Sequence, residues 1–345
     1  MPLRDTIRRV VDGHELSEAE MASAMEAILT GGATGAEIGG FLVALRMRGE
    51  TVGELAGAAR VLRAHAVPIL DVPPGAIDTC GTGGDGAGTL NVSTAAGLVA
   101  AGAGVPVAKH GNRAVSGTVG GADVLEALGV TLDLAPDALS ACLREVGFAF
   151  LYAPLLQPAL RPAAAPRRDL GIRTIFNLLG PLANPAGVRR QVIGVSEPRW
   201  VEPMARVLLR LGAERAWVVH GHGGLDELAL EGESLVAELI DGDVRRRTVS
   251  ASDAGLAAAP LRAVRASSLA EAAERIRAIF AAEPGPGRDI VCLNAAAALV
   301  VAGAADDLRE GARLAAAAID GGAAASLLAR LGQFTAANTA ARSAG

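Results

Sequence analysis

The stretch from Asp78 to Arg113 constrains this chain most, because it carries two strand ends that offer backbone amides and cations to one place. A short strand leads into the glycine loop Gly81-Thr-Gly-Gly-Asp-Gly, and the helix-capping residues of Asn91-Val-Ser-Thr open a long apolar run. A second strand, Val105 to Ala108, ends in Lys-His-Gly-Asn-Arg. Glycines let a backbone approach a ligand closely, and a helix start attracts anions. The stretch therefore indicates a polyphosphate site.

Two different interpretations of the glycine loop are open. The loop fits the G-x-G-x-x-G pattern of dinucleotide-binding folds, but those folds place an acidic residue about 20 residues further on. Here the second strand ends in Lys109, and Ala87 to Leu90 separate the last glycine from the helix. The remaining interpretation is a glycine-rich turn that binds no ligand.

The composition limits the classes of protein that this chain can belong to. Of its 345 residues, 51% are apolar and only 3% are aromatic, so alanine, valine, leucine and glycine must fill a large core. The net charge of −5 argues against a dedicated nucleic-acid binder, which would show a basic surface. We therefore expect no nucleic acid among the partners.

Three features favour a cytoplasmic protein. The N-terminus, Met-Pro-Leu-Arg, lacks the apolar region of a signal peptide. The 3 cysteines show no metal or redox spacing, which indicates reduced thiols. The apolar stretches 90–108 and 290–305 are either interrupted by polar residues and proline or too short to span a bilayer. We expect no membrane segment.

Residues 1–66 are expected to be helical. A capping box, in which serine or threonine precedes glutamate by three residues, marks a helix start. Three such pairs precede apolar residues at helical spacing: Ser17 with Glu20, Thr34 with Glu37, and Thr51 with Glu54.

After the proline-rich linker 67–75, strands and helices alternate, which is typical of an α/β protein with a mostly parallel sheet flanked by helices. Strands are expected at 77–79, 105–108, 148–152, 191–195 and 216–220, with a small surface β meander at 235–249. Helices are expected at 92–103, 122–128, 136–146, 201–211, 269–282, 290–302, 306–319 and 323–340.

Two further segments carry polar residues between these elements. Asp226 and Glu227 follow a strand and a glycine turn, and adjacent carboxylates there suit Mg²⁺, which takes one or two protein oxygens plus substrate phosphate. The competing interpretation is an ordinary solvated acidic turn. The stretch 155–185 is broken by prolines and contains Arg167, Arg168 and Arg173, so we interpret it as a crossing linker that also contributes to a pocket.

Several motifs, taken together and in this order, resemble the anthranilate phosphoribosyltransferases along nearly the whole chain. They are the Gly-Thr-Gly-Gly-Asp loop, Asn91-Val-Ser-Thr, Lys109-His-Gly-Asn-Arg, Ala122-Asp-Val-Leu-Glu-Ala-Leu-Gly, Leu170-Gly-Ile-Arg-Thr-Ile-Phe-Asn-Leu-Leu-Gly-Pro-Leu-Ala-Asn-Pro and Gly224-Leu-Asp-Glu-Leu.

The resemblance implies a small N-terminal helical domain, residues 1–66, completed by a return segment at about 163–185. A larger α/β domain would comprise residues 75–162 and 186–345. It also implies a homodimer through the helical domain, Mg²⁺ as the cofactor, and a step of tryptophan biosynthesis. In that step, phosphoribosyl pyrophosphate (PRPP) and anthranilate give N-(5-phosphoribosyl)anthranilate and pyrophosphate.

The resemblance also assigns the site residues. Asp226 and Glu227, with Ser93, would hold Mg²⁺, while Arg167 would pair with the anthranilate carboxylate. His110 and Asn112 would line the acceptor channel, and Lys109 and Arg167 would take the main catalytic roles. The residues that would bind PRPP are Gly81, Thr82, Gly83, Gly84, Asp85, Thr89, Asn91, Ser93, Thr94 and Lys109.

The chain departs from the family pattern in two places. The stretch Ser116 to Gly121 lacks the second serine of the usual Ser-Gly-Ser turn, and Gln157 replaces a histidine before Pro-Ala. These departures leave open a relative that acts on another aromatic amine. A pyrimidine-nucleoside phosphorylase of the same fold and a non-catalytic paralogue that binds nucleic acid are also open.

Overall fold

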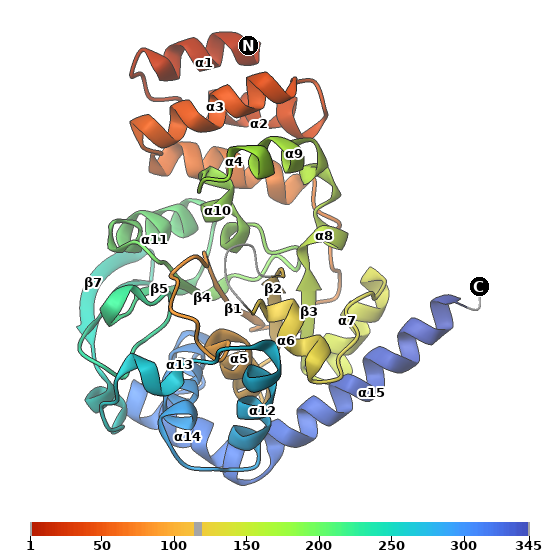
Figure 1. Cartoon of the computed structure of the whole chain (residues 1–345), viewed down its shortest axis with the longest axis vertical. Helices are drawn as coiled ribbons and strands as arrows, with labels where there is room; N and C mark the ends of the chain where they lie inside the picture. Colours follow the sequence, from red (N-terminus) through yellow and green to blue (C-terminus); the bar gives the residue numbers. More distant parts are fainter. Residues whose placement is uncertain (1, 114–118, 344–345) are drawn as a thin grey trace.

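The computed structural model describes residues 2–113 and 119–343. Its N-terminal part is a bundle of four helices (Figure 1). They are α1 (Leu3–Val11), α2 (Glu18–Leu29), α3 (Gly35–Arg48) and α4 (Val52–Ala64). The three predicted capping boxes are present at the starts of α2, α3 and α4. The first helix begins after Pro2 with no side-chain cap, so it lacks the signal that marked the others.

The centre of the larger part is a seven-stranded sheet in the order β3-β2-β1-β4-β5-β6-β7. The strands are β1 (Ile77–Gly81), β2 (Val107–Gly111), β3 (Phe148–Tyr152), β4 (Arg190–Gly194), β5 (Arg215–His220), β6 (Ser234–Ile240) and β7 (Asp243–Val249). The first five are parallel, while β6 and β7 are antiparallel. The predicted meander at 235–249 is therefore not a separate surface element, because β6 pairs with β5 and extends the main sheet.

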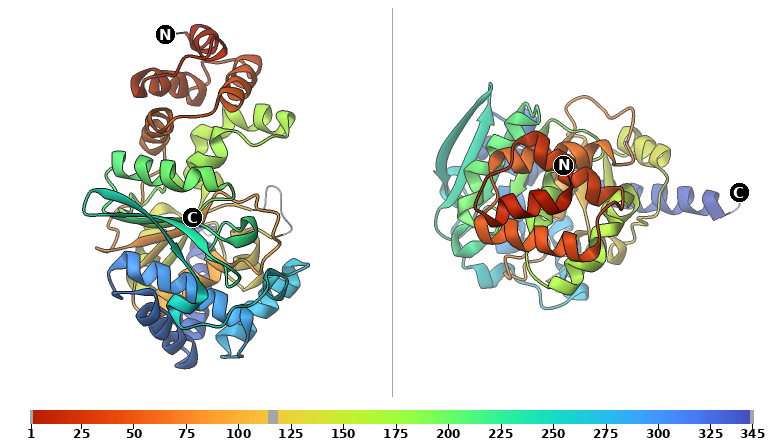
Figure 2. Two further views of the ribbon diagram at one scale, coloured as in Figure 1. Left: turned by 90° about the vertical axis from the view of Figure 1, so that its left-hand side faces the viewer. Right: turned by 90° about the horizontal axis from the view of Figure 1, so that it is seen from above.

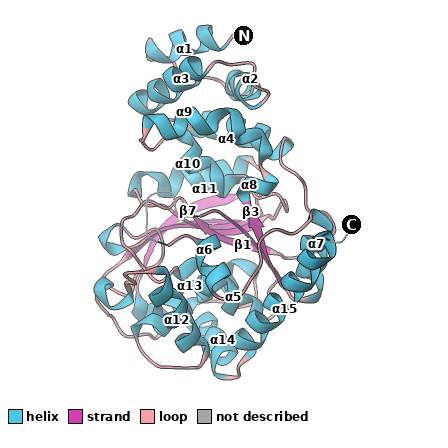
Figure 3. Cartoon of the chain, turned by 45° about the vertical axis from the view of Figure 1, so that its right-hand side comes forward, coloured by secondary structure: helices cyan, strands magenta, loops and turns pink. Residues whose placement is uncertain are grey.

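Helices cover both faces of the sheet (Figure 3). On the face toward the bundle lies α11 (Val201–Arg210), and the other face is covered by the remaining helices of this part. Those are α5 (Val92–Gly102), α6 (Gly121–Ala127), α7 (Pro136–Glu145), α12 (Leu269–Phe280), α13 (Pro286–Ala302), α14 (Leu308–Asp320) and α15 (Ala323–Ser343). This arrangement confirms the predicted fold class.

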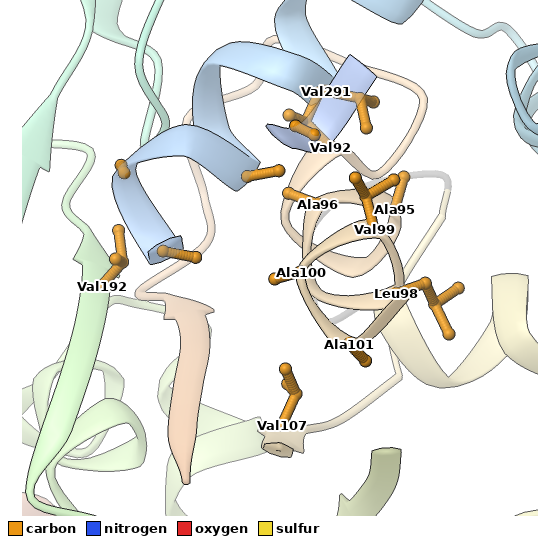
Figure 4. Packing of buried hydrophobic residues seen from close by; sticks show 14 of the residues in the cluster. Val92, Ala95, Ala96, Leu98, Val99, Ala100, Ala101, Val107, Val192 and Val291 are labelled. Carbon is orange, nitrogen blue, oxygen red and sulfur yellow. The ribbon is translucent and has the colours of Figure 1, made fainter. Parts of the chain in front are cut away.

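Small side chains allow close packing at the centre of the core. Val107 of β2 and Val291 of α13 lie on opposite sides of α5, whose alanines and valines fill the space between them (Figure 4). A Cβ atom at Gly97 would lie 2.8 Å from the Thr79 hydroxyl, so α5 approaches β1 too closely for a larger residue. Close packing of small side chains fills the core in this way, although only 3% of the residues are aromatic.

Across residues 2–113 and 119–343, no single helix is both long and apolar enough to cross a membrane. One pair, Leu308–Asp320 with Ala323–Thr339, passes that test only together, and it is bent by 63°.

The proline-rich segment returns to the bundle and is mostly helical. It contains α8 (Ala153–Leu156), α9 (Arg161–Leu170) and α10 (Ile175–Leu179). Prolines stand in the first turn of α8 and α9, where the missing N–H costs nothing, while Pro166 lies inside α9. Helix α9 packs on α2 and α3, and α10 packs on α3 and α4.

The bundle sits beyond one face of the sheet at one end of the molecule (Figure 2). One apolar cluster runs from α1–α4 through α10 to α11 and the adjoining face of the sheet. Since this core is shared, the predicted boundary between a helical and an α/β domain stays a prediction.

Candidate active site

A cavity of about 610 Å³ opens at the carboxyl ends of the parallel strands. Strand β1 lies between β2 and β4, so the chain reverses its direction across the sheet at this point. In open α/β sheets, ligands bind at such a switch point. The lining contains every predicted site residue except Arg167: Gly81, Thr82, Gly83, Gly84, Asp85, Thr89, Asn91, Ser93, Thr94, Lys109, His110, Asn112, Asp226 and Glu227.

Two carboxylates connect the loop after β5 to the glycine loop and to the start of α5. Oδ2 of Asp226 accepts a hydrogen bond from the Gly83 amide at 2.8 Å. Oε1 of Glu227 accepts one from the Ser93 amide at 2.9 Å, and its Oε2 lies 3.5 Å from the Thr89 hydroxyl. The acidic pair therefore belongs to the cavity wall and is not a solvated turn.

Glycines at the ends of three strands make room for this loop. A Cβ atom at Gly194, which ends β4, would lie 1.5 Å from the Asp226 carbonyl oxygen. At Gly81 it would lie 2.5 Å from Asp226 Oδ2, and at Gly221 it would lie 2.3 Å from the Glu227 carbonyl oxygen. Sequence reasoning missed Gly194, because nothing near it in the sequence shows that the loop crosses there.

The acidic pair fits a divalent cation. Burial raises the pKa of Asp226 to about 7 and that of Glu227 to about 8, and the neighbouring carboxylate of Asp85 adds to both shifts. A cation held by this pair would offset the repulsion among the neighbouring carboxylates. Within the described ranges, no group of three or more His, Cys, Asp or Glu side chains could hold a metal alone. A pair suits Mg²⁺, which completes its shell with water and phosphate oxygens.

Lys109 is buried beneath these groups, with 3% of its surface exposed. Its Nζ donates to the Thr79 carbonyl and, at 3.3 Å, to the Ser93 hydroxyl. Burial lowers the pKa of this ammonium, whereas the charges of Asp78 and Glu227 raise it. Lys109 thus places a cation between β1 and the first turn of α5.

Asn91 holds its position differently from our expectation of a helix cap. It stands before α5 with a left-handed φ of 68°, and its side chain makes no capping hydrogen bond. Instead its Oδ1 accepts from the Thr94 hydroxyl at 2.5 Å, and its Nδ2 donates to the Val119 carbonyl at 3.2 Å. The backbone N–H of Ser93 donates to the carboxylate of Glu227 instead, so Glu227 caps the start of α5 in place of Asn91.

The arginines of the return segment divide between two places. Arg167, on α9, lies over the ring of Phe176 at 4.9 Å and outside the cavity lining. Arg173 and Asn177 line the cavity instead. Sequence reasoning did not give these two a role, and the only signal was their place in the Arg-Thr-Ile-Phe-Asn motif.

His110 lines the cavity as a neutral imidazole. Its Nδ1 donates to the Gly180 carbonyl at 3.0 Å, which leaves Nε2 as an acceptor. That Nε2 is buried and has no hydrogen-bond partner within the part of the chain that the structure describes. Burial lowers the pKa of His110 to about 4.

Of the two departures from the family pattern, one lies outside the cavity lining, and the other falls partly outside the described residues and partly in the lining. Gln157 is buried outside the cavity lining, where its Nε2 donates to the Ala183 carbonyl at 2.9 Å. Ser116, Gly117 and Thr118 lie outside the described residues, while Val119, Gly120 and Gly121 line the cavity.

Comparisons with known proteins agree with this geometry. The helical bundle domain of the glycosyl transferase family matches residues 4–66, and the a/b domain of the same family matches residues 73–325. An anthranilate phosphoribosyltransferase of Moorella thermoacetica is 52% identical over 326 residues, which make up 94% of this chain and 96% of that protein.

Solved structures give the same result. The crystal structure of anthranilate phosphoribosyltransferase (TrpD) from Thermus thermophilus is 44% identical, covers 96% of this chain and 99% of its own, and has a TM-score of 0.91. The Saccharomyces cerevisiae enzyme in complex with PRPP and Mg is 25% identical, with coverages of 97% and 98% and a TM-score of 0.88. The family resemblance is confirmed: this chain belongs to the glycosyl transferase family, among the anthranilate phosphoribosyltransferases.

Proposed function

We propose that this chain performs the reaction of its family in the cavity at the carboxyl ends of the strands. PRPP would bind across the glycine loop and the start of α5, and the anthranilate nitrogen would displace pyrophosphate at C1 of the ribose. The observation that carries this proposal is the pair Asp226 and Glu227, which bond to the two segments that offer amides to an anion. The yeast relative, whose complex contains PRPP and Mg, supports it.

The chemistry requires anion stabilisation more than proton transfer. Displacement at C1 develops oxocarbenium character on the ribose and negative charge on the leaving pyrophosphate. Preorganised amides and cations lower the barrier because they are already oriented toward that charge. Gly84, Asp85 and Thr94 would hold the pyrophosphate, with the ammonium of Lys109 beneath it.

Asp226, Glu227 and the hydroxyl of Ser93 would hold Mg²⁺. The Ser93 oxygen accepts from Lys109 at 3.3 Å and keeps a lone pair for a metal. When bound, Mg²⁺ would neutralise phosphate charge on the donor. The protein's part is to orient the carboxylates, which the Gly83 and Ser93 amides do.

The acceptor would lie on the other side of the ribose. Arg167, which lies over the ring of Phe176 and outside the lining of the cavity, is the cation that we assign to the anthranilate carboxylate, since a guanidinium matches a carboxylate with two parallel hydrogen bonds. His110 and Asn112 line the cavity next to Gly111 and would face the acceptor ring. A neutral imidazole at His110 avoids placing a second charge beside the developing oxocarbenium ion.

We also propose that the protein is a cytoplasmic homodimer that associates through its helical bundle. Met47 of α3 and Val11 of α1 are 83% and 69% exposed. Arg48 donates to the His14 carbonyl at 2.5 Å, which keeps these two helix ends together. Large apolar side chains exposed at these two helix ends would suit a subunit interface. The buried free cysteines agree with a reducing compartment.

The test is the fluorescence of anthranilate. We expect it to fall when PRPP and Mg²⁺ are added together, and to stay constant when either is omitted or when inorganic phosphate and ribose replace PRPP. No fluorescence loss in the complete mixture, with an active relative as the positive control, would contradict the proposal.

A further inference from the structure

One peptide of the glycine loop is held from both sides. The N–H of Gly83, in the peptide Thr82–Gly83, donates to Asp226. The carbonyl of the same peptide, Thr82 O, accepts from Nη2 of Arg173 at 3.3 Å, and the next carbonyl, Gly83 O, accepts from Nη1 at 2.7 Å. Because the N–H and C=O of a trans peptide point in opposite directions, Arg173 and Asp226 lie on opposite sides of the loop.

The space beside the loop is shaped for this guanidinium. A Cβ atom at Gly84 would lie 1.8 Å from Nη1 of Arg173, and Gly84 also has a φ of +77°. Any other residue at position 84 would therefore displace the arginine as well as strain the backbone. Both acceptors that Arg173 finds within residues 2–113 and 119–343 are backbone carbonyls. Its guanidinium therefore constrains the backbone conformation of the loop.

Arg173 belongs to the part of the chain that packs on the bundle. It stands between α9, which contacts α2 and α3, and α10, which contacts α3 and α4. On the other side of the glycine loop, Asp226 belongs to the loop after β5. The orientation of one peptide therefore depends on both parts of the molecule.

We infer that Arg173 is a positioning residue for the reaction: it sets the glycine loop from the bundle side, so that the loop meets the pyrophosphate of the donor in one orientation. Arg173 needs no contact with either substrate for this role. The kinetic part of the inference rests on the proposed function, whereas the effect on the loop does not.

Hydrogen–deuterium exchange of the intact protein tests the effect on the loop. Arg173→Gln should speed amide exchange in peptides that cover residues 81–90, because the loop loses two hydrogen bonds to a charged donor. Arg168→Gln is the matched control, since Arg168 lies in the same segment and its side chain is 77% exposed. Arg173→Lys, which keeps the charge but not the two-pronged geometry, should give an intermediate rate and serves if the glutamine variant does not fold.

Steady-state kinetics test the positioning role. For Arg173→Gln we expect the KM for PRPP to rise about tenfold or more. The KM for anthranilate should change by less than about twofold, because Arg173 acts on the loop that meets the donor. A general loss of structure would instead affect the KM values of both substrates. Unchanged exchange at residues 81–90, or an equal effect on both KM values, would overturn the inference. If exchange is faster in Arg173→Gln but the wild type shows no turnover, the effect of Arg173 on the loop is supported and the proposed function is contradicted.

Discussion

The Ser93 amide donates a hydrogen bond of 2.9 Å to Glu227, a residue 134 positions further along the chain. The bond joins the first turn of α5 to the loop after β5, and thus an anion-attracting helix start to a carboxylate that would bind a cation. The fold must hold these two groups together for both to act on one donor molecule.

The first prediction concerns Gly194, which no motif marked. In Gly194→Ala, the new Cβ would overlap the Asp226 carbonyl, so the acidic loop must move. We expect the free energy of unfolding to fall by about 1–3 kcal/mol, as for other overpacked sites. Urea denaturation measures this loss, and a titration with PRPP and Mg²⁺ should show weaker binding. Unchanged stability and affinity would show that the loop is not constrained by β4.

The second prediction concerns Lys109. Lys109→Gln removes the ammonium beneath the cavity, and a lost hydrogen bond to a charged group costs about 1.5–3 kcal/mol. We expect the Kd for PRPP, measured calorimetrically with Mg²⁺ in excess, to rise by at least about tenfold. If the variant binds PRPP as tightly as the wild type, the phosphates bind elsewhere.

The third prediction concerns the acceptor. Arg167→Gln should reduce kcat/KM for anthranilate by the equivalent of about 1–3 kcal/mol, because the carboxylate loses a charged partner. Activity with aniline, which lacks the carboxylate, should hardly change, and Arg168→Gln is the control. A variant that still prefers anthranilate to aniline as strongly as the wild type does would exclude Arg167 from carboxylate recognition.

The fourth prediction concerns pH. An unfolded histidine has a pKa of about 6.5, whereas burial lowers the pKa of His110 to about 4 in the folded protein. The unfolded state therefore binds the proton first. The stability that neutral His110 confers is complete above about pH 6.5 and is lost as the pH falls toward 4.

His110→Asn, which can still donate to the Gly180 carbonyl, should remove this dependence. Between about pH 7.5 and pH 5 we expect the wild type to lose about 2 kcal/mol more stability than the variant. Urea denaturation at the two pH values measures the difference. Equal losses in both proteins would show that the pKa of His110 is not lowered in the folded protein.

Much of the fold could be predicted from the sequence because its signals are local. A capping box such as Thr34 with Glu37 forms within one helical turn, and the structure contains all three that the sequence predicted. The glycine loop and Lys109 mark the ends of adjacent parallel strands, which must meet at one edge of the sheet. That edge contains the cavity.

Features that depend on contacts between distant segments could not be predicted in this way. The pairing of β6 with β5 depends on an available sheet edge, which the period of residues 235–249 does not reveal. The prolines of the return segment indicated an irregular linker, yet several of them stand at helix starts. Gly194 leaves space for the backbone of Asp226, and Arg173 donates to the Gly83 carbonyl. In both pairs the two residues lie far apart in the sequence.

Calorimetric titration of PRPP into the wild type and into Asp226→Asn/Glu227→Gln, with and without Mg²⁺, tests the central claim most directly. These substitutions keep the shape of both side chains, and Glu233→Gln on the exposed surface of the same region is the control. We predict that Mg²⁺ strengthens PRPP binding to the wild type and to the control, and that the double variant loses this effect. Equal strengthening by Mg²⁺ in the double variant would contradict the assignment of the metal and donor site to this cavity.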